Sequence, residues 1–94
     1  MTATPRVDRI RQRLTGGLAP TALEVIDDSH QHVGHAGARD GRGHFTVVIV
    51  SSRFEGIRTV QRHRLVYEAV GDLMQTDIHA LSIHAMTPAE ADAA

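Results

Sequence analysis

The chain has 94 residues, a formal net charge of −1 and 41% hydrophobic residues, which indicates one soluble domain with a single core. It contains no cysteine, so disulfides, thiolate catalysis and a closed thiolate zinc site are excluded. No apolar run approaches the ~18 residues of a membrane span. The amino terminus lacks a continuous apolar segment that could act as a secretory signal, so we expect a cytoplasmic protein.

The first predicted element is a helix from about Pro5 to Thr15. Thr4 offers a hydroxyl cap, and Pro5 suits the first helical position. Apolar residues then recur at helical spacing: Val7, Ile10 and Leu14. The pair Gly16-Gly17 is expected to end the helix.

A first strand is predicted over Leu23–Asp27, with Leu23 and Val25 facing the core and Glu24 facing outward. Residues 28–43 follow, with four glycines and no usable periodicity, and are expected to form a loop. A loop this long in a small domain is uncommon unless it is functional or disordered. It also holds three of the seven histidines of the chain: His30, His32 and His35.

The second half of the chain predicts a strand, a helix and a strand. The segment His44–Val50 is apolar on both faces, so it is expected in the middle of the sheet. A connector containing Gly56 leads to a helix. Thr59 is expected to cap the start of this helix, and residues 75–77 are expected to end it. A third strand is predicted over residues 78–85, and residues 88–94 are expected to be a flexible tail after a core of about 5–87.

The topology predicts where the histidines lie. A strand, a helix and a strand in one sheet usually form a right-handed crossover with parallel strands. His44 and His79 would then begin neighbouring strands at one end of the sheet, where the histidine-rich loop also enters. His63, at the start of the second helix, should be remote. His84, five residues after His79, should point to the opposite sheet face.

Histidines gathered at one end of a sheet suggest a metal site, because neutral imidazole binds zinc, iron and copper. Two ligands do not close a site, and zinc prefers four. His30 and His32 could complete the set, or a second protein could. The alternatives are a solvated loop, with His79 bonded to backbone at a strand end, and a protein that binds zinc alone.

Other chemistry is poorly supported. The serines lie in no nucleophile elbow, there is no phosphate-binding loop, and Asp27 and Asp28 point to opposite faces, so we expect no enzyme. A local basic segment could contact phosphate, or it could be a solvated helix face in which Arg64 pairs with Glu68. Its residues are Arg53, Arg58, Arg62 and Arg64.

The sequence resembles the BolA family. The segments that carry the resemblance cover most of the chain, from Leu23 to Glu90, in the expected order and spacing. They are LEVIDDS, HFTVVIVSSRFEG, QRHRLVYEAV and IHALSIHAMTPAE.

The resemblance implies an α+β fold of order α-β-β-α-α-β, similar to type II KH domains. Its three-stranded mixed sheet has helices packed on one face, and a short extra helical turn lies near residues 54–58. The whole of residues 1–94 would form a single BolA-like domain.

The resemblance also implies a non-enzymatic partner of a monothiol glutaredoxin, in iron homeostasis or cluster delivery. In that family the two proteins form a heterodimer that bridges a [2Fe–2S] cluster, with sulfur ligands from the glutaredoxin cysteine and from glutathione. The ligands from the BolA side are the His of the I-H-A-L segment, which is His79, and a Cys or His in the loop. In this loop His35 is the first choice, His32 the second and His30 the third.

Some members of the family are described as transcriptional regulators, so DNA binding through the basic segment Arg53–Arg64 is the alternative. The Gly-x-x-Gly loop with which KH domains clamp nucleic acid is missing, since Gly56 is followed by Ile57, Arg58 and Thr59. This departure argues against direct RNA binding.

Overall fold

The structure is a computed structural model that describes residues 5–29 and 42–93. Within these ranges the expected order α-β-β-α-α-β is found, with a 3-10 turn, η3, between the second strand and the second helix and one further helix after the third strand. The elements are α1 (Pro5–Leu18), β1 (Ala22–Asp27), β2 (Gly43–Val50), η3 (Ser52–Phe54), α2 (Thr59–Val70), α3 (Leu73–Thr76), β3 (Ile78–Met86) and α4 (Pro88–Ala93). Most of the expected loop 28–43, namely residues 30–41, lies outside the described residues.

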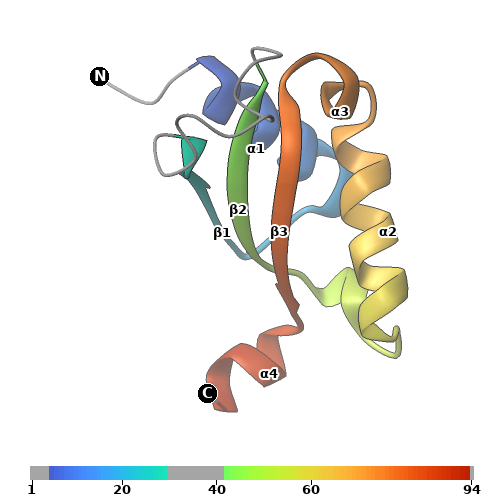
Figure 1. The fold of residues 1–94 in the computed structure, drawn as a ribbon. Helices are drawn as coiled ribbons and strands as arrows, with labels where there is room; N and C mark the ends of the chain where they lie inside the picture. The colour runs from blue at the N-terminus through green and yellow to red at the C-terminus, as the bar shows by residue number, and fades with distance from the viewer. Residues whose placement is uncertain (1–4, 30–41, 94) are drawn as a thin grey trace.

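The three strands form one mixed sheet in the order β1-β2-β3 (Figure 1). β1 pairs with β2 antiparallel, and β2 pairs with β3 parallel. The prediction that β2 is the central strand and that β2 and β3 are parallel is therefore confirmed. A crossover through α2 and α3 joins the two parallel strands, as the usual connection of such strands requires.

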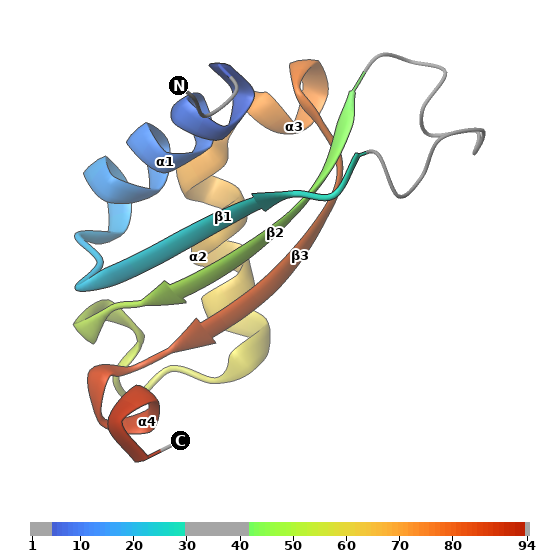
Figure 2. The same ribbon diagram turned by 90° about the vertical axis from the view of Figure 1, so that its left-hand side faces the viewer.

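The helices α1, α2 and α3 lie on one side of the sheet (Figure 2). Alternate residues of β2, namely Phe45, Val47 and Ile49, are buried beneath them. α1 contributes its predicted apolar stripe to the same core: Val7, Ile10 and Leu14, joined by Leu18. No helix in the described part of the chain is long and apolar enough to cross a membrane.

The first helix does not end at Gly16-Gly17 as predicted. It continues through both glycines to Leu18, whose side chain is buried in the core. A Cβ added at Gly17 would lie 3.1 Å from the Cβ of Ala69 in α2. Gly17 therefore permits the close approach of two helices, and the burial of Leu18 outweighs the weak helix propensity of glycine.

The second predicted helix is divided in two. Gly71 adopts φ 55°, a backbone conformation that favours glycine, and this ends α2 before the short helix α3 begins. Thr59 is the first residue of α2, whereas Arg58 holds the cap position without a side-chain hydrogen bond, so the predicted Thr59 cap was wrong. The extra helical turn lies at residues 52–54, slightly before the expected position.

The expected flexible tail forms a helix instead. The hydroxyl of Thr87 accepts a hydrogen bond from the Glu90 backbone N–H, and the Glu90 carboxylate accepts one from the Thr87 N–H. This reciprocal pair is a capping box, and Pro88 occupies the first helical position. The sequence T-P-A-E therefore carried a helix-start signal that the tail prediction overlooked.

Candidate functional site

The amino-terminal ends of β2 and β3 meet at one edge of the sheet, because the two strands are parallel. His44 lies at the start of β2 and His79 at the start of β3. Their ring centroids are 5.2 Å apart, with the ring planes tilted by 47°. The prediction that these two histidines lie together is confirmed.

A bulge in β3 presents His79 at this edge. Gly43 pairs with Ile78, and the next residue, His44, pairs with Ala80, so His79 is the extra residue. Ile78 is fully buried, whereas His79 is exposed. Bulges of this kind are frequent beside functional sites because they redirect a side chain.

The bulge also affects the prediction that His84 points to the sheet face opposite His79, because that prediction assumed regular alternation along the strand. Ile78 and Leu81 are three residues apart, yet both pack on the helix-covered core, so the regular alternation is broken between them. Counting residues from His79 to His84 therefore does not establish the face of His84. His84 pairs with Val48, farther along the strand, and is exposed.

The side chain of Arg42, two residues before His44, contacts His79. Its Nη1 donates a hydrogen bond to the Met74 carbonyl oxygen over 3.0 Å, and its Nη2 lies 3.4 Å from Nδ1 of His79. One guanidinium thus connects α3 to the candidate ligand on β3.

The chain that leads into residues 30–41 is fixed beside His44. The backbone N–H of His44 donates to the Ser29 hydroxyl over 3.0 Å, and the Asp28 N–H donates to the His44 carbonyl over 2.8 Å. The Ser29 N–H in turn donates to the Asp27 carboxylate over 2.9 Å, and the Thr46 hydroxyl donates to the Asp28 carboxylate. Ser29 and Arg42, the residues on either side of the undescribed segment, therefore both lie at the His44–His79 edge.

Asp77 supports the start of β3 from the helix side. Its carbonyl accepts a hydrogen bond from the Gly43 N–H over 2.9 Å, and its carboxylate lies 2.7 Å from Nη1 of Arg9 in α1. The Thr76 hydroxyl, followed by the Arg9 and Arg6 guanidinium groups, lowers the pKa of the Asp77 carboxyl from its ordinary value, although desolvation opposes the shift. The carboxylate is therefore stabilised in its charged form next to the site.

The described residues do not form a complete metal site. Among them there is no group of three or more His, Cys, Asp or Glu side chains that could hold a metal ion. His30, His32 and His35 lie outside the described residues, so their assignment as ligands stays a prediction. One exposed imidazole can supply a single ligand, so a metal bound at His79 would need further ligands from outside the described residues.

His63 lies away from this edge, as predicted. It lines a surface hollow of about 620 Å³ together with His84 and apolar residues of β2 and β3. The pair was not anticipated, because the sequence separates the two histidines by twenty-one positions.

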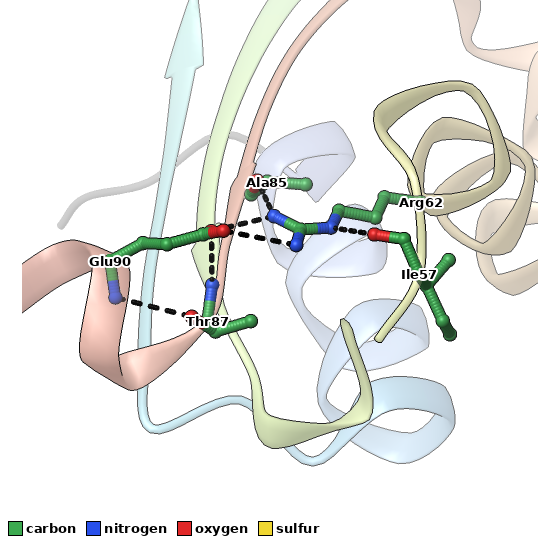
Figure 3. Close-up of polar contacts among 5 residues, drawn as sticks. All are labelled: Ile57, Arg62, Ala85, Thr87 and Glu90. Carbon is green, nitrogen blue, oxygen red and sulfur yellow. Dashed lines mark hydrogen bonds and ion pairs between the residues drawn. The ribbon is translucent and has the colours of Figure 1, made fainter. Parts of the chain in front are cut away.

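The basic segment is not a uniform patch. Arg62 is turned inward, with its side chain only 12% exposed, and contacts the carbonyl oxygens of Ile57 and Ala85 and the carboxylate of Glu90 (Figure 3). The other arginines of the segment, Arg53, Arg58 and Arg64, are exposed. A nucleic acid could therefore meet these three side chains, whereas Arg62 is committed to contacts within the protein.

Comparison with known proteins places the chain among relatives of the same fold. Residues 14–90 match the family model described as BolA-like protein. The chain is 49% identical over 87 residues to SufE-like protein 1, chloroplastic/mitochondrial, and 47% identical over 88 residues to Protein BOLA1, chloroplastic, both from Arabidopsis thaliana. The matches cover 87% and 90% of this chain but only 24% and 55% of those relatives.

A bacterial relative is covered more fully. The chain is 40% identical over 80 residues to the DNA-binding transcriptional regulator BolA of Escherichia coli (strain K12), covering 85% of this chain and 73% of the relative.

Solved structures agree with these matches. The BolA domain of SufE1 from Arabidopsis thaliana superposes with a TM-score of 0.83 at 45% identity, covering 95% of this chain and 99% of that one. BolA1 from Mus musculus gives a TM-score of 0.82 at 42% identity, covering 99% and 73%. Together with the family match over most of its length, these likenesses show that the chain belongs to the BolA-like protein family.

Proposed function

We propose that this chain is a non-enzymatic adaptor that pairs with a monothiol glutaredoxin and, with glutathione, holds a bridging [2Fe–2S] cluster. The observation that carries the proposal is the exposure of His79 at a β-bulge, beside His44 and in contact with Arg42, the residue that follows 30–41. A ligand shared with a partner must be exposed on a rigid element, and His79 meets both conditions.

The composition of the chain supports a shared site. Iron–sulfur clusters are held mainly by thiolates, and His replaces Cys in some of them. This chain has no cysteine, so it can supply imidazole but no thiolate. The thiolates would come from the glutaredoxin cysteine and from glutathione, as the family resemblance implies. The second imidazole would come from His35, or failing that from His32 or His30.

His44 is better suited to supporting the site than to ligation. Its Nε2 is buried, so this nitrogen is not presented to a docking protein. Its backbone N–H and C=O hold the chain at Ser29 and Asp28. The His44 ring can therefore pack against His79 and fix the direction in which that ligand points.

The test is reconstitution of the complex under anaerobic conditions, with a monothiol glutaredoxin, glutathione, iron and sulfide. Visible absorption and circular dichroism should show a cluster spectrum that differs from that of the glutaredoxin alone. His79→Ala should return the spectrum to that of the glutaredoxin alone. Among the loop variants, His35→Ala should have the largest effect, and His32→Ala and His30→Ala smaller ones.

His84→Ala is the matched control, because His84 is also an exposed histidine on β3 but lies farther along the strand. It should leave the cluster spectrum unchanged. If the wild-type protein forms no complex, or if His79→Ala and His84→Ala behave alike, the adaptor proposal is rejected.

DNA binding is a second candidate function, favoured by the 40% identity to a relative named as a DNA-binding transcriptional regulator. Arg53, Arg58 and Arg64 are exposed and could contact phosphate. Arg58→Ala or Arg64→Ala should then weaken duplex binding and reduce its salt dependence by about one counterion each. Binding that is insensitive to both changes and to salt would exclude this surface.

A further inference from the structure

The side chain of Arg42 contacts the candidate ligand directly, and its hydrogen-bonding chemistry constrains the state of that ligand. A guanidinium carries only donors, whereas a neutral imidazole has one donor nitrogen and one acceptor nitrogen. The ring nitrogen that faces Nη2 of Arg42 is Nδ1 of His79, at 3.4 Å. For this contact to be favourable, Nδ1 must be the acceptor and the ring proton must lie on Nε2.

A second hydrogen bond restrains the guanidinium of Arg42 in this position. Nη1 of Arg42 donates to the Met74 carbonyl over 3.0 Å, in the short helix α3. Met74 packs against the hydrophobic core, so this acceptor belongs to a fixed part of the fold. The planar fork of arginine suits such a bridge between two acceptors, which the single ammonium of lysine would reproduce poorly.

We propose that Arg42 is a positioning residue for His79: its guanidinium bridges Met74 and His79, holds the ring as the Nε2–H tautomer, and occupies the only lone pair of the ring. This inference rests on the proposed role of His79 as a ligand and adds a level of regulation to it. A metal that binds Nδ1 must displace Arg42. A metal that binds Nε2 drives the ring proton to Nδ1, where it would oppose the guanidinium donors.

The consequence is competition between Arg42 and a metal for His79. In the protein alone the contact keeps His79 oriented and reduces its affinity for stray divalent ions. A docking partner that moves Arg42 would release the ring for coordination. The same contact therefore disfavours the alternative in which this protein binds zinc by itself.

The first experiment reads the tautomer of His79 in the isolated protein. Long-range ¹H–¹⁵N correlation spectra, recorded at alkaline pH where imidazole rings are neutral, distinguish a protonated ring nitrogen from an unprotonated one. Wild-type His79 should be the Nε2–H tautomer, and Arg42→Ala should give a mixture. Arg53→Ala, which removes an exposed arginine from η3, should leave the spectrum of His79 unchanged. An Nδ1–H tautomer in the wild type, or an unchanged spectrum in Arg42→Ala, overturns the proposal.

The second experiment titrates the isolated protein with Zn²⁺ alone. Arg42→Ala should bind Zn²⁺ about tenfold more tightly than the wild type, the effect of losing one charge-assisted competitor. In a His79→Ala background, Arg42→Ala should produce no gain. If Arg42→Ala raises the Zn²⁺ affinity equally in the wild type and in His79→Ala, the cause is a general charge effect. If it raises the affinity in neither, Arg42 does not compete with the metal. Either result overturns the proposal. Since neither experiment uses glutaredoxin, failure of the adaptor function would be seen separately in the reconstitution.

Discussion

Arg62 in α2 and Glu90 in α4 form a two-pronged ion pair, with Nη1–Oε1 2.6 Å and Nη2–Oε2 3.1 Å apart. The same guanidinium donates to the Ile57 carbonyl over 2.7 Å and to the Ala85 carbonyl over 3.1 Å, and lies over the Phe54 ring at 6.0 Å from its centroid. One side chain thereby joins the loop before α2, the end of β3 and the carboxy-terminal helix.

Arg62→Ala should destabilise the protein by about 1–3 kcal/mol, because it removes charge-assisted hydrogen bonds and leaves two carbonyl groups with fewer donors. Urea unfolding followed by far-UV circular dichroism would measure the loss. Arg53→Ala is the control, since an exposed arginine outside this network should change stability by no more than about 0.5 kcal/mol. Equal stability of the two variants would mean that the Arg62 contacts contribute nothing measurable.

Stability should fall in acid partly through Glu90. The Arg62 hydrogen bond, followed by the Thr87 backbone N–H, lowers the pKa of the Glu90 carboxyl from 4.5 to about 2. Because the folded-state pKa is the lower one, this stabilisation is complete above about pH 4.5 and is lost as the pH falls toward about 2.

Glu90→Gln removes this titration and should make the decline in urea midpoint between about pH 5 and pH 2 shallower than in the wild type. Glu24→Gln, on the exposed side of β1, is the control for the loss of one carboxylate outside the Arg62 network. A wild-type slope in Glu90→Gln would show that the Arg62 pairing does not contribute to acid sensitivity.

Gly43→Ala should be strongly destabilising, because there is no room for a side chain where β2 begins. An added Cβ would lie 2.5 Å from the Ser29 hydroxyl oxygen and 2.8 Å from the Phe45 ring. Since overpacking of this kind costs about 1–3 kcal/mol, the urea midpoint should drop clearly. Gly16→Ala in α1 is the matched change, with no atom within 4 Å of the added Cβ, and should be neutral or stabilise by up to about 1 kcal/mol.

The order of elements and the meeting of His44 with His79 could be predicted because they depend on local patterns and on one topological rule. Apolar periodicity identified α1 and β2, and the usual crossover connection of a strand, a helix and a strand predicted that β2 and β3 are parallel. Those two facts suffice to bring the starts of both strands to one edge of the sheet.

The contacts made by individual side chains could not be predicted in the same way. The bulge at His79 is a property of strand register, which depends on how Ile78 is buried against the helices. The inward turn of Arg62 depends on α4, which was expected to be a flexible tail, so its acceptor Glu90 was assigned no role. Gly17 was taken for a helix end because its packing partner, Ala69, is distant in sequence.

Two aspartates each pair with an arginine of α1. Asp77 lies 2.7 Å from Arg9 with its side chain 11% exposed, whereas Asp72 lies 2.9 Å from Arg13 with its side chain 71% exposed. Water screens an exposed pair, but a mostly buried carboxylate depends on its partners. Asp77→Asn should therefore cost about 1–3 kcal/mol, and Asp72→Asn less than about 0.5 kcal/mol. Urea unfolding of both variants at neutral pH measures the difference, and equal losses would show that burial at the start of β3 does not strengthen the pairing.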